Sequence, residues 1–245
     1  MKLLLTSGGV TNPSIHAALV ELLGKPVAES KALVIPTAQW GHPSCGPASV
    51  RGLIAAEPVW GSFTGLGWAS LGVLELTTLP TVGAERWVPW VRGADVLLVD
   101  GGDATYLAHW MRESGLADLL PSLTDTVWVG VSAGSMVMTP RIGDLFVEWA
   151  AAPDDRTLGL VDFSIFPHLN AFPTNTPAEA ERWAADLGAP AYAIDEQTAI
   201  SVVDGRVEVV SEGEWTAFGF SGGRSSDQSA DQSVSGAALT TPSAD

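Results

Sequence analysis

The chain has 245 residues, 46% of them hydrophobic, which is enough to bury one substantial core. Its formal net charge of −16, with only 12 Lys and Arg, argues against nucleic acid and anionic membranes as partners. A single cysteine, Cys45, excludes an intramolecular disulfide, and the sequence has no Cys and His pairs at zinc-binding spacing.

The first half of the chain alternates short apolar runs with segments of helical character. The apolar runs, rich in Val, Leu and Ile, are at residues 2–6, 32–36, 73–76, 95–99 and 127–131. The helical segments are at residues 13–23, 47–56, 84–91 and 104–120, the last with a break near Gly115. This alternation predicts an α/β fold with a mainly parallel sheet that is covered on both faces.

After residue 132 the pattern is more mixed. It predicts strands at residues 145–149 and 163–166, a helix at 177–187, and a hairpin of strands 198–203 and 206–210 turned by Asp204 and Gly205. Residues 221–245 contain no aromatic residue and are mostly Ser, Gly, Ala, Asp and Gln, so we expect a disordered tail. Residues 1–220 are then a single catalytic domain. The N-terminal apolar run is too short for a signal peptide, and no later run is long enough to span a membrane, so we expect a cytoplasmic protein.

A G-x-S-x-G pattern at residues 130–134 lies between a buried strand and a helical segment. The glycines allow a tight turn that exposes the hydroxyl of Ser132, and the N–H of Ala133 in the first helical turn can donate to an oxyanion. The same pattern fits a serine that only caps a helix beside small packing residues. We interpret Ser132 as the nucleophile of a serine hydrolase.

A serine nucleophile needs a base, and the chain has four histidines, His16, His42, His109 and His168. His168 follows the apolar run 163–166, where a loop residue can stand over the carboxyl edge of the sheet. The other three fall in predicted helices or a loop. We predict His168 as the base, with a hydrogen-bonded surface histidine as the alternative.

An acid must orient the imidazole and stabilise its charged form. The acidic residues between Ser132 and His168 are Asp144, Glu148, Asp154, Asp155 and Asp162. Asp154 and Asp155 follow a proline in a predicted turn, and Asp162 can cap a strand end. Asp144 and Glu148, which flank a strand-like stretch, remain the two candidates.

A second glycine turn follows the apolar run at residues 95–99. Gly101 and Gly102 leave backbone N–H groups free to point at an anion, which makes Gly102 a candidate oxyanion donor. Asp103 is either the N-cap of the next helix or a residue that binds substrate. Successive parallel strands open onto the same edge of a sheet, so we expect this turn to converge with the one at Ser132.

In these segments the chain resembles peptidase family S51, which includes dipeptidase E (alpha-aspartyl dipeptidase) and, more distantly, cyanophycinase. The resemblance spans roughly residues 1–210 and rests on residues 7–9, 101–105, 130–134 and 166–168, followed by Asn170. It implies a three-layer α/β/α fold similar to class I glutamine amidotransferases, with Ser in place of their Cys. It also implies a triad that uses neither metal nor cofactor.

The resemblance assigns a role to each matching residue. Ser132 becomes the nucleophile, His168 the general base, and Gly102 and Ala133 the oxyanion donors. The family's acid falls a dozen or more residues after the serine, which favours Asp144 over Glu148.

The substrate implied by the resemblance is a short peptide, in particular a dipeptide with N-terminal Asp. An aspartyl side chain needs a cation, for which Arg182 in the predicted helix is the candidate. An exposed Arg182 paired with Glu179 or Asp186 fits that helix as well, and residues 170–177 depart from the family pattern. We expect a small peptide as partner, neither nucleic acid nor membrane, and the sequence leaves a homodimer open.

Other functions share parts of this pattern. An α/β-hydrolase esterase has G-x-S-x-G but places its histidine near the chain end, whereas no histidine follows His168. A cyanophycinase-like or carboxypeptidase-like peptidase would use the same triad on longer substrates. A non-catalytic binding module on a glutaminase-like scaffold would keep Ser132 without chemistry. Neither glycine turn supplies G-x-G-x-x-G, which argues against a Rossmann oxidoreductase.

Overall fold

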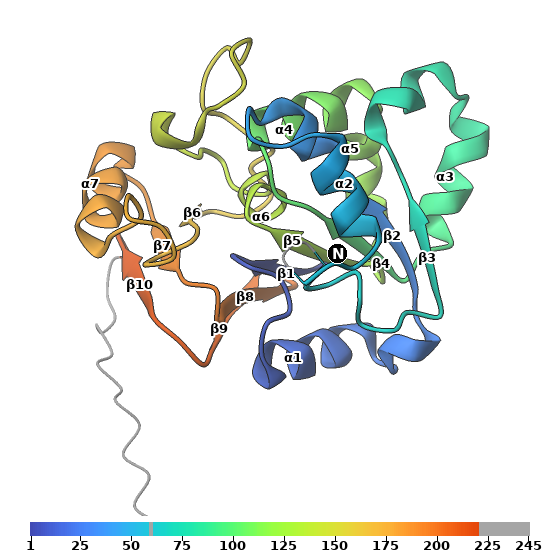
Figure 1. The fold of residues 1–245 in the computed structure, drawn as a ribbon, viewed down its shortest axis with the longest axis horizontal. Helices are drawn as coiled ribbons and strands as arrows, with labels where there is room; N and C mark the ends of the chain where they lie inside the picture. Colours follow the sequence, from blue (N-terminus) through green and yellow to red (C-terminus); the bar gives the residue numbers. More distant parts are fainter. Residues whose placement is uncertain (59–60, 221–245) are drawn as a thin grey trace, which may run out of the picture.

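The computed structural model describes residues 1–58 and 61–220 (Figure 1). Within them the strands are β1 (Lys2–Thr6), β2 (Lys31–Ile35), β3 (Ser70–Val73), β4 (Val96–Val99), β5 (Val127–Val131), β6 (Ser164–Phe166), β7 (Ala191–Ile194), β8 (Thr198–Val203), β9 (Arg206–Ser211) and β10 (Trp215–Phe218). The helices are α1 (Pro13–Leu23), α2 (Pro47–Ile54), α3 (Ala84–Arg92), α4 (Ala104–Glu113), α5 (Leu116–Leu119), α6 (Ala133–Met136) and α7 (Pro177–Leu187).

A central sheet has the strand order β3-β2-β4-β5-β1-β8-β9. Its first five strands are parallel to one another, and β8 and β9 form an antiparallel hairpin beside β1. In this register Gly130 of β5 lies opposite both Leu5 of β1 and Val99 of β4. The carboxyl ends of β1, β4 and β5 therefore meet at one edge of the sheet, as predicted for the two glycine turns.

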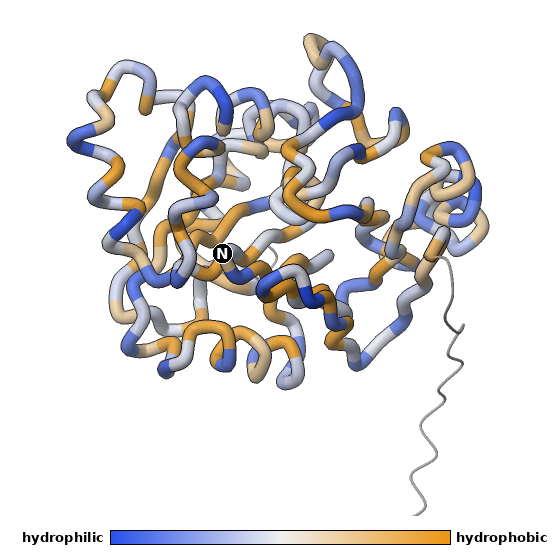
Figure 2. The backbone as a smooth tube through the Cα atoms, turned by 180° about the vertical axis from the view of Figure 1, so that it is seen from behind, coloured by the Kyte–Doolittle hydropathy of each residue, from blue (hydrophilic) through white to orange (hydrophobic). Residues whose placement is uncertain are grey.

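Helices cover both faces of the central sheet. On one face Ile15 of α1 and Leu53 of α2 pack in a core with Leu98 of β4. On the other face Leu107 of α4 packs with Trp128 of β5 in a larger core, to which α3 also contributes. Figure 2 shows hydrophobic stretches of the chain gathered in the central strands. The predicted α/β fold with a mainly parallel, doubly covered sheet is confirmed.

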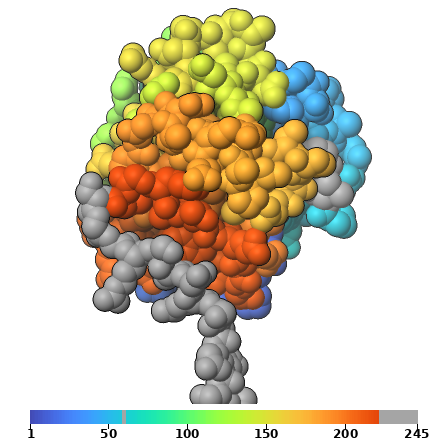
Figure 3. All heavy atoms as spheres, turned by 90° about the vertical axis from the view of Figure 1, so that its left-hand side faces the viewer, coloured from blue at the N-terminus to red at the C-terminus, as the bar shows by residue number. Residues whose placement is uncertain are grey.

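A second, smaller sheet with the order β10-β7-β6 lies to one side of the first (Figures 1 and 3). Strand β6 is parallel to β7, with Phe166 opposite Ala193, and β10 is antiparallel to β7. Helix α7 packs against this sheet through Trp183, which contacts Phe166 edge to face. The parallel register places the loop after β6 beside the turn after β7, and this juxtaposition builds half of the site described below.

Several predicted elements are confirmed in detail. The helix at residues 177–187 has the predicted bounds, and the hairpin turns at Asp204 and Gly205, both with positive φ. Gly115, with φ of 80°, separates α4 from α5 as expected.

Other predictions were incomplete or wrong. Residues 145–149 do not form a strand: a 3₁₀ turn (Asp144–Phe146) is followed by irregular chain, because the carboxylate of Asp103 accepts the N–H groups that a strand would use. Strand β3 begins at Ser70, before the predicted run, and β7 and β10 were not predicted. The predicted tail, 221–245, lies outside the described residues. Among the described helices none is long and apolar enough to cross a membrane.

Candidate active site

Ser132 occupies a sharp turn between β5 and α6. Its φ of 50° and ψ of −111° lie in a region that a non-glycine residue adopts only when its surroundings impose it, at roughly 1–3 kcal/mol. The N–H of Ser132 donates to the carbonyl of Thr6 at 3.0 Å, and its own carbonyl accepts from Ser135 and Met136 at 2.9 Å. These bonds hold the strained turn and leave the hydroxyl facing the open edge of the sheet.

The flanking glycines are required by close backbone contacts. A Cβ on Gly130 would collide with the carbonyl of Gly134, and a Cβ on Gly134 would collide with the carbonyl of Val99. Side chains at either position would separate α6 from β4 and β5. The two glycines of the G-x-S-x-G pattern thus permit this packing, which places Ser132 at the apex of the turn.

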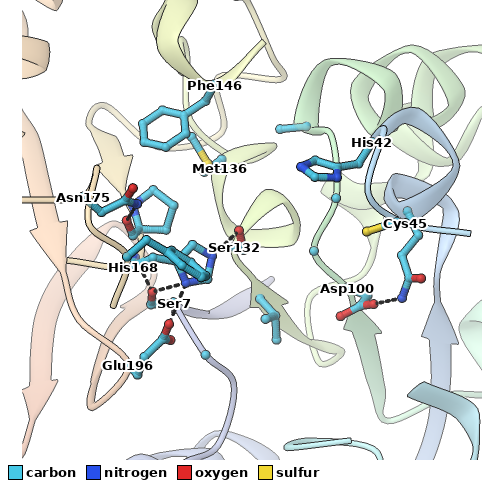
Figure 4. Close-up of a pocket in the computed structure, with 18 of the residues that line it drawn as sticks. Ser7, His42, Cys45, Asp100, Ser132, Met136, Phe146, His168, Asn175 and Glu196 are labelled. Carbon is cyan, nitrogen blue, oxygen red and sulfur yellow. Dashed lines mark hydrogen bonds and ion pairs between the residues drawn. The ribbon is translucent and has the colours of Figure 1, made fainter. Parts of the chain in front are cut away.

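His168 lies against Ser132. It follows β6 with φ of 60°, and its backbone N–H donates to Oγ of Ser7 at 2.6 Å. Its Nε2 is 2.9 Å from Oγ of Ser132, and its ring packs edge to face on Phe172. The structure therefore brings together the serine and the histidine that the sequence singles out (Figure 4).

The carboxylate at the imidazole is Glu196, so the prediction of Asp144 or Glu148 at this position is wrong. Glu196 lies in the turn between β7 and β8, and its Oε1 is 2.7 Å from Nδ1 of His168 (Figure 4). Its Oε2 is buried against Gly8 and has no hydrogen-bond partner among the described residues. A side chain at Gly8 would displace this carboxylate, which explains the glycine after Ser7.

The two predicted acids are held elsewhere by the fold. Asp144 is exposed and lines a separate hollow beside Trp183. Glu148 is exposed at the rim of the cleft described below, and its backbone N–H is tied to the carboxylate of Asp103 at 2.8 Å. Asp144 and Glu148 were chosen because they lie between the serine and the histidine in the chain, whereas Glu196 comes 28 residues after His168.

The sequence around Glu196 has one local feature that points to a strand end. Asp195 and Glu196 stand between the apolar runs 191–194 and 198–203, which the structure shows to be β7 and β8. A carboxylate at a strand end is an ordinary loop residue unless its strand is known to pair with the one that carries the histidine. That pairing, β6 with β7, is a tertiary feature.

Two backbone N–H groups stand beside the serine. Gly102 has φ of 133°, and a Cβ there would collide with the backbone of Ala38. The position that a Cβ on Gly101 would occupy is 3.4 Å from Cβ of Ser132, so the two glycine turns do converge. Ala133 is the first residue of α6, where an N–H has no acceptor within the helix. Within residues 1–58 and 61–220, no loop carbonyl or side chain accepts from Gly102 or Ala133.

Asp103 is the N-cap of α4, one of the two roles predicted for it, and it does not line the cleft, so the alternative of a contact with substrate is wrong. It is fully buried, and its Oδ1 caps α4 by accepting from the N–H of Tyr106 and the hydroxyl of Thr105, both at 2.6 Å. Its Oδ2 accepts the N–H groups of Glu148 and Trp149 at 2.8 and 2.7 Å. Four donors satisfy this carboxylate and fasten the segment around Glu148 to α4.

Arg182 lies outside the site, so the predicted partner for a substrate aspartate is wrong. Its side chain is 67% exposed on α7 and pairs with Glu179 one turn earlier. The alternative from the sequence, an exposed helix residue in an ion pair, is correct.

A cleft of about 800 Å³ opens in front of Ser132. Its walls come from both halves of the site (Figure 4), and among the side chains that line it are Phe146, Met136, Phe172, Asn175, Gln39, His42, Cys45 and Asp100. Burial raises the pKa of Asp100 from 3.8 to about 6, although hydrogen bonds from Gln39 and the Gly101 backbone oppose the rise. Burial and the nearby charge of Asp100 also raise the pKa of the Cys45 thiol. That thiol is therefore not an activated nucleophile.

A serine hydroxyl, an imidazole and a carboxylate in a hydrogen-bonded row, beside two free backbone N–H groups, define the class of serine hydrolases. The sequence model of peptidase family S51 matches residues 3–210. The chain therefore belongs to peptidase family S51 and is a serine peptidase.

Two solved structures share the fold. One is a protein provisionally assigned as a peptidase E from Listeria monocytogenes EGD-e, with a TM-score of 0.64, 20% identity, and coverage of 86% of this chain and 98% of that one. The other is a peptidase from an acI-B1 Actinobacterium, with a TM-score of 0.59, 21% identity, and coverage of 87% and 88%. A search of curated proteins finds no significant match.

Proposed function

We propose that this peptidase cleaves short peptides, dipeptides foremost, through an acyl-enzyme on Ser132, with His168 as general base and Glu196 as the orienting acid. The observation that carries the proposal is the unbroken row from Ser132 Oγ to His168 Nε2, 2.9 Å, and from His168 Nδ1 to Glu196 Oε1, 2.7 Å. Both distances are those of direct hydrogen bonds.

The polarity of this row suits the reaction. A carboxylate only accepts hydrogen bonds, so Nδ1 of His168 carries the proton and the lone pair of Nε2 faces Ser132. Ser7, which accepts the backbone N–H of His168, fixes where the ring can lie. The hydroxyl of Ser132 therefore donates to Nε2 in the resting state and can lose its proton as it attacks.

The reaction then proceeds in two steps, acylation of Ser132 and hydrolysis of the acyl-enzyme. Oγ of Ser132 attacks the scissile carbonyl while its proton passes to Nε2 of His168, and the oxyanion takes hydrogen bonds from the N–H groups of Gly102 and Ala133. The imidazolium, stabilised by Glu196, gives its proton to the leaving amine as the C–N bond breaks. Water repeats the attack on the ester, His168 again takes and returns the proton, and the acid product leaves.

The size of the cleft supports a short substrate. Its volume of about 800 Å³ is in the range of pockets that enclose small ligands rather than long chains. Specificity for N-terminal Asp finds no support in the position of Arg182, which is on the outer surface of α7.

The direct test is hydrolysis of Ala-Leu by the wild type and by Ser132→Ala. We expect the variant to lose at least about 10³-fold in kcat/KM with an unchanged circular dichroism spectrum, because the nucleophile alone is removed. Wild-type-like cleavage by Ser132→Ala would refute the proposal. Lack of cleavage by the wild type, with intact binding of the peptide, would favour a binding module instead. Faster cleavage of longer peptides would favour the cyanophycinase-like or carboxypeptidase-like alternative.

A further inference from the structure

One buried carboxylate, Asp100, lines the cleft on a different wall from the triad (Figure 4). It is only 8% exposed, and its Oδ2 accepts a hydrogen bond from the amide of Gln39. The other end of that amide accepts from Ser49 at 2.5 Å, so Gln39 is held in place. The hydrogen bonds to Asp100 thus come from neutral groups, and no Lys or Arg of the described residues forms an ion pair with it.

The described residues that line the cleft carry several acidic side chains and no lysine or arginine. Three carboxylates line it, those of Asp100, Glu148 and Glu196, and no Lys or Arg is among the described residues that do. Glu196 is matched by His168, whereas Asp100 has no such partner. An anionic substrate side chain would enter this cleft against like charges, within a protein of net charge −16.

Asp100 lines the same cleft as Ser132 and adjoins Gly101 in the chain. The point that a Cβ of Gly101 would occupy is 3.9 Å from Oγ of Ser132. In a peptide with a free amino terminus, the ammonium nitrogen is two bonds from the carbonyl carbon that Ser132 attacks. An ammonium group at that position would lie in the cleft that Asp100 lines.

We propose that Asp100 binds the ammonium group of the substrate residue that acylates Ser132, so that the enzyme takes peptides with a cationic or neutral residue there and rejects an aspartyl one. This inference rests on the proposed function of the same site. An ammonium group occurs at the free amino terminus and on a lysine side chain, and the experiment below separates the two.

The energetics support a functional role for Asp100. A carboxylate buried without a cation is disfavoured in its charged form, and the raised pKa of Asp100 reflects this cost. A buried structural carboxylate, such as Asp103, is satisfied by several donors. The charged form of Asp100 instead has no cationic partner among the described residues, and the ammonium group of a substrate would supply one.

The first experiment compares four peptides on the wild type: Ala-Leu, N-acetyl-Ala-Leu, N-acetyl-Lys-Leu and Asp-Leu. We expect kcat/KM for Ala-Leu to exceed that for N-acetyl-Ala-Leu and for Asp-Leu by at least about tenfold, the range of a charge-assisted contact. If kcat/KM for N-acetyl-Lys-Leu returned to the value for Ala-Leu, the lysine side chain would be the preferred source of the ammonium group. Equal rates for all four would overturn the inference.

The second experiment compares Asp100→Asn with Asp144→Asn, which removes the same charge at an exposed position outside the cleft. For Asp100→Asn we expect KM for Ala-Leu to rise about tenfold or more, while KM for N-acetyl-Ala-Leu changes by less than about twofold. Asp144→Asn should alter KM for both peptides by less than about twofold, because its charge is exposed to solvent and lies outside the cleft. Equal losses on both peptides in Asp100→Asn would contradict the inference.

A binding measurement keeps the inference separate from the chemistry. Calorimetric titration of Ala-Leu into Ser132→Ala, and into the double variant Ser132→Ala with Asp100→Asn, needs no turnover. We expect about tenfold weaker binding in the double variant. Equal affinity in the two proteins, or no binding to Ser132→Ala, would overturn the role of Asp100. Failure of the proposed hydrolysis would instead appear as cleavage that does not depend on Ser132.

Discussion

The two halves of the site are built on different principles. The proposed nucleophile and oxyanion donors come from tight glycine turns after β4 and β5, where adjacent parallel strands leave no space for a Cβ. The proposed base and acid come from loops after β6 and β7 of the small sheet, where hydrogen bonds set the position of each side chain. The first half is determined by local steric contacts, which can be recognised in the sequence as a short motif. The second half is determined by contacts between distant parts of the chain, which produce no such motif.

Replacement of Glu196 should have the largest effect and tests the half that depends on distant contacts. In Glu196→Gln the amide can accept from Nδ1 or donate to it, so the tautomer of His168 is no longer fixed. We expect kcat for Ala-Leu to fall roughly 10³- to 10⁴-fold, about 4 to 5 kcal/mol. Steady-state kinetics beside Asp144→Asn, expected to stay within about twofold, provides the matched control. A large loss in Asp144→Asn and none in Glu196→Gln would restore the first prediction.

Replacement of a motif glycine tests the steric half. In Gly134→Ala the new methyl meets the carbonyl of Val99, so α6 must move away from β4. We expect the free energy of unfolding to fall by about 3 kcal/mol in urea denaturation. The control is Gly46→Ala, where a Cβ meets nothing within 4 Å, with an expected loss of at most about 1 kcal/mol from the changed helix cap. Equal losses in both variants would show that the packing around Gly134 can relax.

Asp100 follows β4 directly and belongs to the half of the site that is built on glycine turns. Because its folded-state pKa, about 6, lies above the ordinary 3.8, the folded protein binds this proton more tightly than the unfolded chain. Ionisation of Asp100 therefore lowers the free energy of unfolding as pH rises from about 4 through about 6. Asp100→Asn should be more stable than the wild type at pH 8 by up to about 3 kcal/mol, with the difference vanishing near pH 4. Denaturant titrations of both proteins at the two pH values measure this difference in the free energy of unfolding. A destabilised variant at pH 8 would show that the charge supports the fold.

The smallest expected effect is that of Ser7, which positions the base. Loss of its hydroxyl in Ser7→Ala leaves the N–H of His168 without its acceptor, so the ring is less well aligned. We expect kcat for Ala-Leu to fall about tenfold, about 1.4 kcal/mol, with KM little changed. Ser62→Ala removes a nearby hydroxyl that donates to the carbonyl of Gly8 and should stay within about twofold. Similar losses in both variants would indicate a general loosening of the cleft.

The same contrast explains what the sequence could predict. The alternation of apolar runs and helical segments was sufficient for the α/β fold, and the glycine patterns located the two turns that carry Gly102, Ser132 and Ala133, because sterics restrict those positions locally. The apolar run at residues 163–166 pointed to His168, which follows it. Glu196 could not be located, because its neighbour in space depends on the pairing of β6 with β7.

Two further residues show why local patterns fell short. Asp103 has the sequence context of an exposed turn, yet the segment at residues 148–149 folds over it and buries it. Arg182 satisfied a family expectation by position, but its side chain is exposed on α7 and does not line the cleft. In both cases the outcome depends on which surface a segment covers, which no short motif specifies.

The central claim is that Ser132 is an activated nucleophile, and the most direct measurement is labelling with a serine-directed phosphonate followed by mass spectrometry. The account predicts a single adduct on Ser132 in the wild type, much slower labelling in Glu196→Gln, and none in folded Ser132→Ala. An adduct on a different residue, or no adduct on the folded wild type, would contradict it.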